Sequence, residues 1–355
     1  MRRPSLRAAA PVFMPALLAL LSACGTAPVP APSAPPAPSA ASAPSALSAP
    51  FAPSAAATRP ASWAAPQVLV APCAGVHSLV IDPKGPRLAT SDGQAFDPAT
   101  AGQLAVPAGM KIEGNDLWVA DVFGFRRVDV RTGEVRDVLR MQRDPDLDHP
   151  FAVGLSARLF ALSSWVGGTV QLLDRQTLKT VDTLRGLKTP FDAVPMPDGS
   201  VIYAEFATGS ITRASGPKFA DRLVLASGLS GPVQMVVGQD GALYVTEAAG
   251  KLLRIPLDAS APLRTVADGL ALPEGLAQTP WGSFVVAESA ARRLVEIDPA
   301  TGTRRTVADN LPIGLAPGPG LPPPYVVTGV AVGRDGTVYV GADRNNAIYL
   351  IHPVR

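Results

Sequence analysis

The carboxylates of this 355-residue chain recur at a spacing that could hold a hard cation or cap backbone turns. Glu205, Glu247 and Glu288 each stand six residues after a glycine, and Asp121 and Asp343 occupy corresponding places in other parts of the chain. Carboxylate oxygens are the ligands that Ca²⁺ prefers. An acid that recurs in unit after unit is, however, more simply explained as a turn cap that accepts hydrogen bonds from backbone N–H groups. We expect these five acids to be caps.

Two further acids break the repeat. Asp192 and Glu274 occupy strand-start positions where other units hold Phe151, Val233 and Thr328. A departure from a repeat favours a function, so Asp192 and Glu274 are the candidate metal or ligand residues. A divalent cation, Ca²⁺ or Zn²⁺, would be the cofactor. No residue is assigned a catalytic role.

The first residues have the order of a secretion signal. Arg2, Arg3 and Arg7 precede an apolar stretch that is too short to span a bilayer and that ends in Leu21-Ser22-Ala23-Cys24. This ending resembles the bacterial lipobox, in which the cysteine is acylated and the preceding residues, here 1–23, are removed. The resemblance implies lipidation of Cys24, and two or more acyl chains anchor a protein stably. Gly25 after the cysteine implies the outer membrane, facing the periplasm, by similarity to lipoprotein sorting in enteric bacteria. The alternative is an ordinary secretory signal with an incidental cysteine.

Residues 24–66 read as a disordered tether. They are nearly all Pro, Ala and Ser, with no charge before Arg59, and cannot bury a core. The chain after residue 23 has a formal net charge of −1, because three of the arginines behind the total of +2 lie in the leader. This charge does not favour a nucleic-acid partner. The other cysteine, Cys73, is expected to be a buried apolar side chain.

From residue 67 to 355 the chain repeats. Gly199, Gly241, Gly282 and Gly336 lie 42, 41 and 54 residues apart, each in a tight turn between a short apolar strand and a strand rich in β-branched and aromatic residues. Two more strands follow in each unit. Four antiparallel strands in about forty residues predict the blade of a β-propeller, and therefore an all-β fold.

Seven units are expected, with six as the alternative. Their first strands begin near His77, Lys111, Phe151, Phe191, Val233, Glu274 and Thr328. The last unit ends after its third strand, and the strand Gln67–Val70 has no blade of its own. We expect this N-terminal strand to complete the last blade and close the ring, which removes two exposed edges.

The repeat resembles the NHL repeat and the related SMP-30/gluconolactonase propellers. The segment 328–343, with Asp335-Gly336 at its turn, and Pro273-Glu274-Gly275-Leu276-Ala277 carry the resemblance. It implies the propeller fold over residues 67–355. It also implies an axial metal that polarises a lactone carbonyl, but the asparagines that complete that metal site are missing from this chain.

Three other features bear on function. His77, His149 and His352 are scattered, which disfavours a zinc site rich in imidazole. The acids of Asp144–His149 alternate as in a calcium loop but lack its glycine and glutamate, so a solvated loop is expected. The insertion 310–327, rich in Pro, Gly and Leu, is expected on the face of Asp192 and Glu274, either as a lid over a ligand or as a plug on the axis.

These features favour a ligand- or protein-binding scaffold of the cell envelope, held to the membrane by its lipid anchor. The partner, a protein or a small molecule, is unknown. The alternative is a metal-dependent, lactonase-like hydrolase or lyase of the SMP-30 kind.

Overall fold

The computed structural model describes residues 57–71, 76–82, 85–90, 104–141, 143–258, 261–316, 324 and 326–354, with only the backbone of 76–90. Almost all regular structure in this part is β-strand. The only helical turns in it are two 3-10 segments, η1 (Pro217–Phe219) and η2 (Ser289–Ala291). No helix among these residues is long and apolar enough to cross a membrane. Residues 1–56, which include Cys24, and Cys73 lie outside the described residues.

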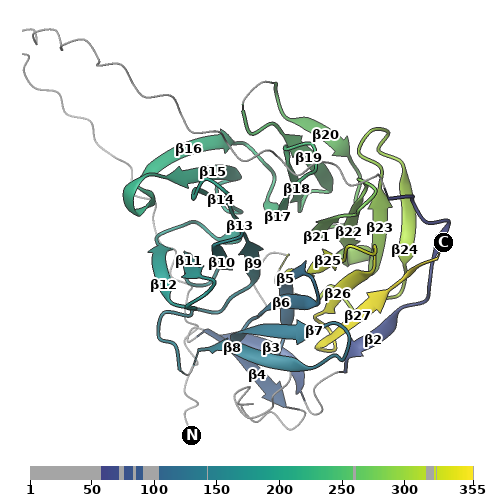
Figure 1. Cartoon of the computed structure of the whole chain (residues 1–355), viewed down its shortest axis with the longest axis horizontal. Coiled ribbons are helices and arrows are strands. Elements are labelled where there is room, and N and C mark those ends of the chain that lie inside the picture. The colour runs from purple at the N-terminus through teal and green to yellow at the C-terminus, as the bar shows by residue number, and fades with distance from the viewer. Residues whose placement is uncertain are drawn as a thin grey trace, which may run out of the picture. The chain divides into compact units, whose positions relative to one another are not determined.

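Six four-stranded antiparallel sheets, here called blades 1 to 6, surround a common axis (Figure 1). Blade 1 contains β5 (Pro107–Glu113), β6 (Asp116–Asp121), β7 (Gly124–Asp129) and β8 (Val135–Arg140). Blade 2 contains β9 (Ala152–Leu155), β10 (Leu159–Ser164), β11 (Thr169–Asp174) and β12 (Thr180–Leu184). Blade 3 contains β13 (Pro190–Pro195), β14 (Val201–Glu205), β15 (Ser210–Ser215) and β16 (Asp221–Ala226).

The second half of the ring follows the same order, from the axis outward. Blade 4 contains β17 (Pro232–Val237), β18 (Leu243–Glu247), β19 (Lys251–Ile255) and β20 (Arg264–Ala267). Blade 5 contains β21 (Pro273–Gln278), β22 (Phe284–Glu288), β23 (Arg293–Ile297) and β24 (Arg304–Ala308). Blade 6 contains β25 (Val330–Val332), β26 (Val338–Ala342), β27 (Ala347–Ile351) and, as its outer strand, β2 (Gln67–Val70).

The second strand of each blade is packed between the two neighbouring blades, so both of its faces are buried. All five residues of β18, β22 and β26 are buried. These strands therefore read as continuous apolar runs instead of alternating ones. The turn before the second strand contains a glycine of positive φ in every blade except blade 2. Gly199, for example, has a φ of 85°, and Asp198 accepts a hydrogen bond from the N–H of Ser200.

The structure corrects the number of blades expected from the sequence: the ring has six blades and not seven. The unit near His77 forms only a two-stranded sheet, β3 (Val76–Asp82) with β4 (Gly85–Thr90), which pairs with none of the six blades in the described part of the chain. The inner strand β25 contacts β5 directly. A Cβ on Gly329 would come within 2.0 Å of the carbonyl oxygen of Ala108, so no space for a seventh blade remains between blades 6 and 1.

The N-terminal strand pairs with the last blade. β2 runs antiparallel to β27, with Gln67 opposite Leu350 and Val68 opposite Tyr349. Packed residues also begin before the expected domain boundary at 67. Residues 57–66, here called the strap, run beside β24 and the C-terminus (Figure 1). Within the strap, β1 (Ser62–Trp63) pairs with β28 (Pro353–Val354).

Candidate functional site

The acids at the ends of the second strands are caps, as the sequence predicts. Each accepts a hydrogen bond from the N–H of the segment that leads into its own blade. The donors are Ala105 and Val106 to Asp121, Lys188 to Glu205, Ser230 to Glu247, Ala271 to Glu288 and Leu315 to Asp343, at 2.6–3.0 Å. Five of the six blades are tied to their incoming segments in this way, which explains why the acid recurs.

Blade 2 is the exception, because its second strand ends in Ser164. The Ser164 hydroxyl oxygen accepts a hydrogen bond from the N–H of Gly167 in the following turn, at 3.1 Å. In blade 2 a serine hydroxyl therefore caps the turn in place of a carboxylate.

Asp192 lies beside the axis and is fully buried. One of its carboxylate oxygens accepts a hydrogen bond from the N–H of Met235 on β17 (2.8 Å), and the other from the N–H of Ala193 (2.9 Å). Burial raises the pKa of Asp192 to about 6, although Lys111 and the two N–H groups favour the charged form. The side chain therefore joins the free inner edges of blades 3 and 4.

Gln234 joins the inner strands of blades 4 and 5 as Asp192 joins those of blades 3 and 4. Gln234 is not among the candidate residues expected from the sequence. Its Oε1 accepts a hydrogen bond from the N–H of Leu276 on β21 at 3.2 Å. Its Nε2 faces Gly109 of blade 1, where an added Cβ would come within 2.9 Å of it. The inner strands begin at Pro190 and Pro232, so Gln234, and not Val233 as expected, stands at the repeat position of Asp192, and its polar side chain is the signal in the sequence. Asp192 and Gln234 together satisfy the backbone at the axis.

Glu274 and Asp343 form a buried pair of carboxylates. Glu274 accepts hydrogen bonds from the N–H of Thr328 (2.7 Å) and the hydroxyl of Ser289 (2.8 Å). Burial and, secondly, the charge of Asp343 raise the pKa of Glu274 to about 8. Burial raises the pKa of Asp343 to about 6, and its Oδ1 has no hydrogen-bond partner. At neutral pH one proton is therefore retained on Glu274.

The insertion 310–327 contributes apolar side chains to the mouth of the axis. Val326 and Leu315 pack in the cluster of Phe151, and Val327 packs against Phe191 and Val233. The described residues of the insertion therefore belong to the apolar packing at the axis. Residues 317–323 and 325 lie outside the described part of the chain.

The structure gives Asp192 and Glu274 different partners. The charge that acts on Asp192 is that of Lys111, whereas the charge that acts on Glu274 is that of Asp343. Every carboxylate oxygen of these two residues already accepts an N–H or O–H group of the chain. Within the described residues, no three side chains of the His, Cys, Asp or Glu type gather as metal ligands. The residues present do not fit the axial metal that the SMP-30 resemblance implies.

The loop Asp144–His149 is partly exposed, and His149 Nδ1 lies 2.9 Å from Asp148 Oδ1. His149 has a left-handed backbone (φ 32°) and directly precedes a proline. Thr189, Gly231 and Leu272 also have positive φ, and each directly precedes the proline that begins the inner strand of its blade. The conformation of His149 therefore belongs to the repeat. His352 Nδ1 and the Thr337 hydroxyl share a hydrogen bond of 3.0 Å. His352 is far along the chain from His149, and the side chain of His77 lies outside the described residues.

Comparisons with known proteins agree with the fold. No family model matches the chain, and no curated protein matches it. A solved protein of unknown function from Bacteroides thetaiotaomicron is similar, with a TM-score of 0.58, 12% identity and coverage of 81% of this chain and 75% of that one. So is an auxiliary nutrient binding protein from the same organism (TM-score 0.54, 11% identity, 75% and 82% covered). A virginiamycin B lyase from Staphylococcus aureus is also similar (TM-score 0.52, 14% identity, 81% and 98% covered). Such low identities show the β-propeller fold alone.

Proposed function

We propose that this protein is a binding scaffold of the bacterial cell envelope, a propeller held to a membrane by a lipidated Cys24. One observation carries the binding role. The carboxylates that an axial catalyst would use are hydrogen-bonded to the backbone, in Asp192 to Met235 and in Glu274 to Thr328. Carboxylates occupied in this way hold the ring together, which leaves the surfaces of the propeller as its means of recognition.

The sequence supports the envelope location. The lipobox-like ending Leu21-Ser22-Ala23-Cys24 and the uncharged segment before Arg59 suit an anchor and a spacer. At roughly 3 Å per residue, a Pro-rich spacer of this length extends on the order of 100 Å. We infer that the propeller works at a distance from the lipid surface, at the outer membrane and facing the periplasm.

The binding role is tested against the lactonase-like alternative on one protein. Lactone turnover by the full-length chain is measured with and without added Ca²⁺ and Zn²⁺, for the wild type and for Glu274→Gln. We expect no turnover that depends on Glu274, because its two oxygens are occupied by Thr328 and Ser289. Metal-dependent turnover that Glu274→Gln abolishes would overturn the scaffold.

The anchor is tested by Cys24→Ser. A serine cannot take the thioether-linked lipid, so the variant should leave the membrane fraction or remain unprocessed. Fractionation and the mass of the N-terminus give the answer, and unchanged processing together with unchanged membrane association would contradict the anchor.

A further inference from the structure

The strap lies in a groove between blades 5 and 6 and shows how the outer surface of this propeller holds a peptide. The N–H groups of Ala61 and Ala64 donate to the carbonyl oxygens of Val354 (3.1 Å) and His352 (2.9 Å), where the chain leaves β27. On the other wall, Arg305 of β24 donates to the carbonyl oxygen of Pro60 at 2.7 Å. The strap is therefore an extended strand bound mainly through its backbone.

Two side chains fix the strap in its groove. Trp63 packs on Trp281, with ring centroids 5.9 Å apart, and the Arg305 guanidinium lies 5.8 Å from the Trp63 ring. Arg59 donates to the fully buried Glu296 at 2.8 Å. One aromatic residue and one ionic residue four positions earlier thus set the register of the strand.

The same groove exists between blades 3 and 4 but holds no strand of the described chain. The register makes Leu223 on β16 equivalent to Arg305, since Leu223 pairs with Arg213 as Arg305 pairs with Glu296. Ile255 at the end of β19 is equivalent to Ile351 at the end of β27. β16 is the last strand of its sheet, and no strand pairs beyond it among the described residues.

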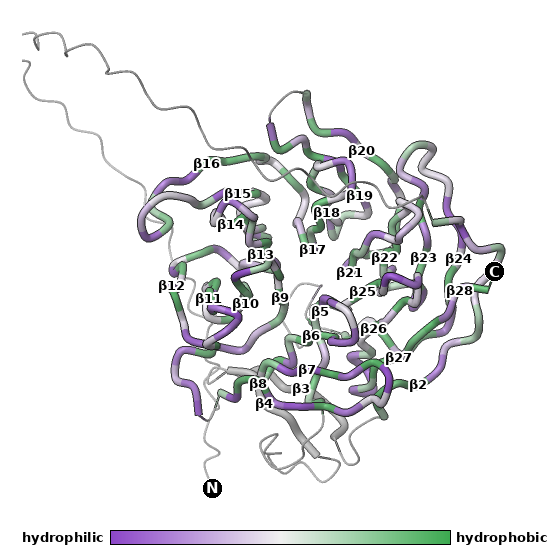
Figure 2. The backbone as a smooth tube through the Cα atoms, in the orientation of Figure 1, coloured by the Kyte–Doolittle hydropathy of each residue, from purple (hydrophilic) through white to green (hydrophobic). Residues whose placement is uncertain are grey.

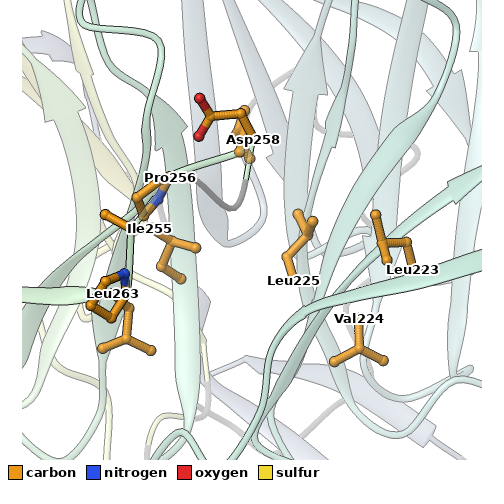
Figure 3. A pocket seen from close by; sticks show the side chains of 10 residues that line it. Leu223, Val224, Leu225, Ile255, Pro256, Asp258 and Leu263 are labelled. Carbon is orange, nitrogen blue, oxygen red and sulfur yellow. The ribbon is translucent and has the colours of Figure 1, made fainter.

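This second groove has a volume of about 460 Å³, and Asp258 is the one charged residue among its otherwise apolar described lining. In Figure 3, the side chains of Leu223, Val224 and Leu225 form one side and those of Ile255, Pro256 and Leu263 the other. Figure 2 shows the hydrophobic stretch of β16 at the rim of the ring. Leu223, Val224 and Leu263 are 59%, 57% and 41% exposed, respectively. Large apolar side chains that remain this exposed around a hollow mark an interaction surface.

The grooves differ at the position of Leu223 in a way that defines the occupant. Between blades 4 and 5 the equivalent residue is Arg264, which donates to the carbonyl oxygen of Pro299 at 3.2 Å, and between blades 5 and 6 it is Arg305. Both arginines bind carbonyl groups, whereas a leucine binds apolar side chains. Arg213 stands where Glu296 stands, but its guanidinium donates to Asp198 and Ser200 of its own blade and offers no ionic contact to an occupant.

We propose that the groove between blades 3 and 4 binds an extended peptide of a partner protein that carries a large apolar side chain. The proposal deepens the binding role proposed above and rests on it. Two observations carry it. The equivalent groove between blades 5 and 6 already holds such a strand through its backbone and Trp63, and the groove between blades 3 and 4 is lined mainly by exposed apolar side chains.

The probe is a synthetic peptide of the strap sequence, Thr58–Pro66, that carries Arg59→Ala, which removes the cation that Glu296 binds in the strap. Its anisotropy is titrated with the full-length chain, with Leu223→Asp, and with Val181→Asp as the matched control. Val181 is 57% exposed on β12, the outer strand of blade 2, and does not line the groove. We expect saturable binding by the wild type and the control, weakened about tenfold or more by Leu223→Asp and by Trp63→Ala in the peptide.

Absence of saturable binding by the wild type, or equal binding by Leu223→Asp, would overturn the proposal. A photo-cross-linking residue placed at position 223 of the full-length chain then identifies the natural occupant. A cross-link to an extended segment of another protein supports the proposal. Cross-links to a second copy of the chain, or to residues 25–56 of the same chain, would overturn it. None of these outcomes depends on Glu274, so failure here is distinct from failure of the scaffold function, which the lactone assay decides.

Discussion

Two of the three buried glutamates of blade 5 have opposite properties, one at the axis and one at the rim. Glu274 and Glu296 are 2% and 0% exposed. Burial raises the pKa of Glu274 to about 8, with help from the carboxylate of Asp343. Burial acts on Glu296 in the same direction, but hydrogen bonds from Ser283, Trp281, Arg305 and Arg59 outweigh it and lower the pKa. The hydrogen-bond donors and charges around a carboxylate can therefore outweigh the effect of its burial on the pKa.

The largest change in stability at the rim is expected when the strap and β2 are removed. A chain that starts at Pro72 lacks Arg59, Trp63 and β2, so Glu296 loses one cation and the outer edge of β27 becomes free. We expect a loss of at least about 5 kcal/mol of unfolding free energy, or about 10 °C in melting temperature, with aggregation. Thermal unfolding followed by circular dichroism measures it. A chain that starts at Arg59 is the control, and equal melting temperatures would show that strap and β2 are dispensable for closure.

Glu296→Gln removes the charge at the rim and leaves the axis unchanged. Arg59 and Arg305 would then face an uncharged amide, and breaking a buried ion pair costs about 3 kcal/mol. Urea unfolding at pH 7 measures the loss. Glu134→Gln, in an exposed pair with Arg136, is the matched control and should change little. Equal effects of the two variants would mean that the strap is not held by Glu296.

Because the pKa of Glu274 is raised and that of Glu296 is lowered, the two residues should change the unfolding free energy with pH in opposite directions. The folded pKa of Glu274, about 8, lies above its ordinary 4.5, so the folded state binds more protons between these values. Its contribution to stability is full below about pH 4.5 and is lost as the pH rises to 8. Glu274→Gln should flatten this slope and be more stable than the wild type at pH 9, on the order of 3 kcal/mol. Denaturant unfolding between pH 5 and 9 tests this, and parallel curves for the two proteins would refute it.

The smallest effect is expected in the bare groove. Leu223 is 59% exposed, so Leu223→Asp should change the unfolding free energy by less than about 0.5 kcal/mol. The same urea titration measures it. A clear loss of stability would show that Leu223 is already covered in the isolated protein.

Much of the fold follows from local sequence. The glycines at positions 199, 241 and 282 set the period, and the acids six residues later were recognisable as caps because they repeat. Gln67–Val70 was identified as an outer strand of the last blade, and it pairs with β27. Signals of this kind repeat along the chain and need no knowledge of distant residues.

The remainder depended on contacts between distant parts of the chain. The unit near His77 has one apolar strand and a turn, which resembles the start of a blade, but the number of blades is set where β25 meets β5. Trp63 lies in a segment whose composition is that of a tether, and nothing near it in sequence indicates Glu296. Glu274 was singled out because it breaks the repeat. The sequence could not show that its oxygens are occupied by Ser289 and Thr328.

The strap also determines when during synthesis the ring can be completed. Arg59 and Glu296 are 237 residues apart, and β1 pairs with Pro353–Val354. The strap is therefore synthesised long before the strand with which it pairs. Until then, the strands β1 and β2 lack their partners β28 and β27, and contacts of such high sequence separation form slowly. An incomplete chain exposes the unpaired edges of these two strands during its synthesis, so its folding should depend on protection that lasts until β27 and β28 emerge.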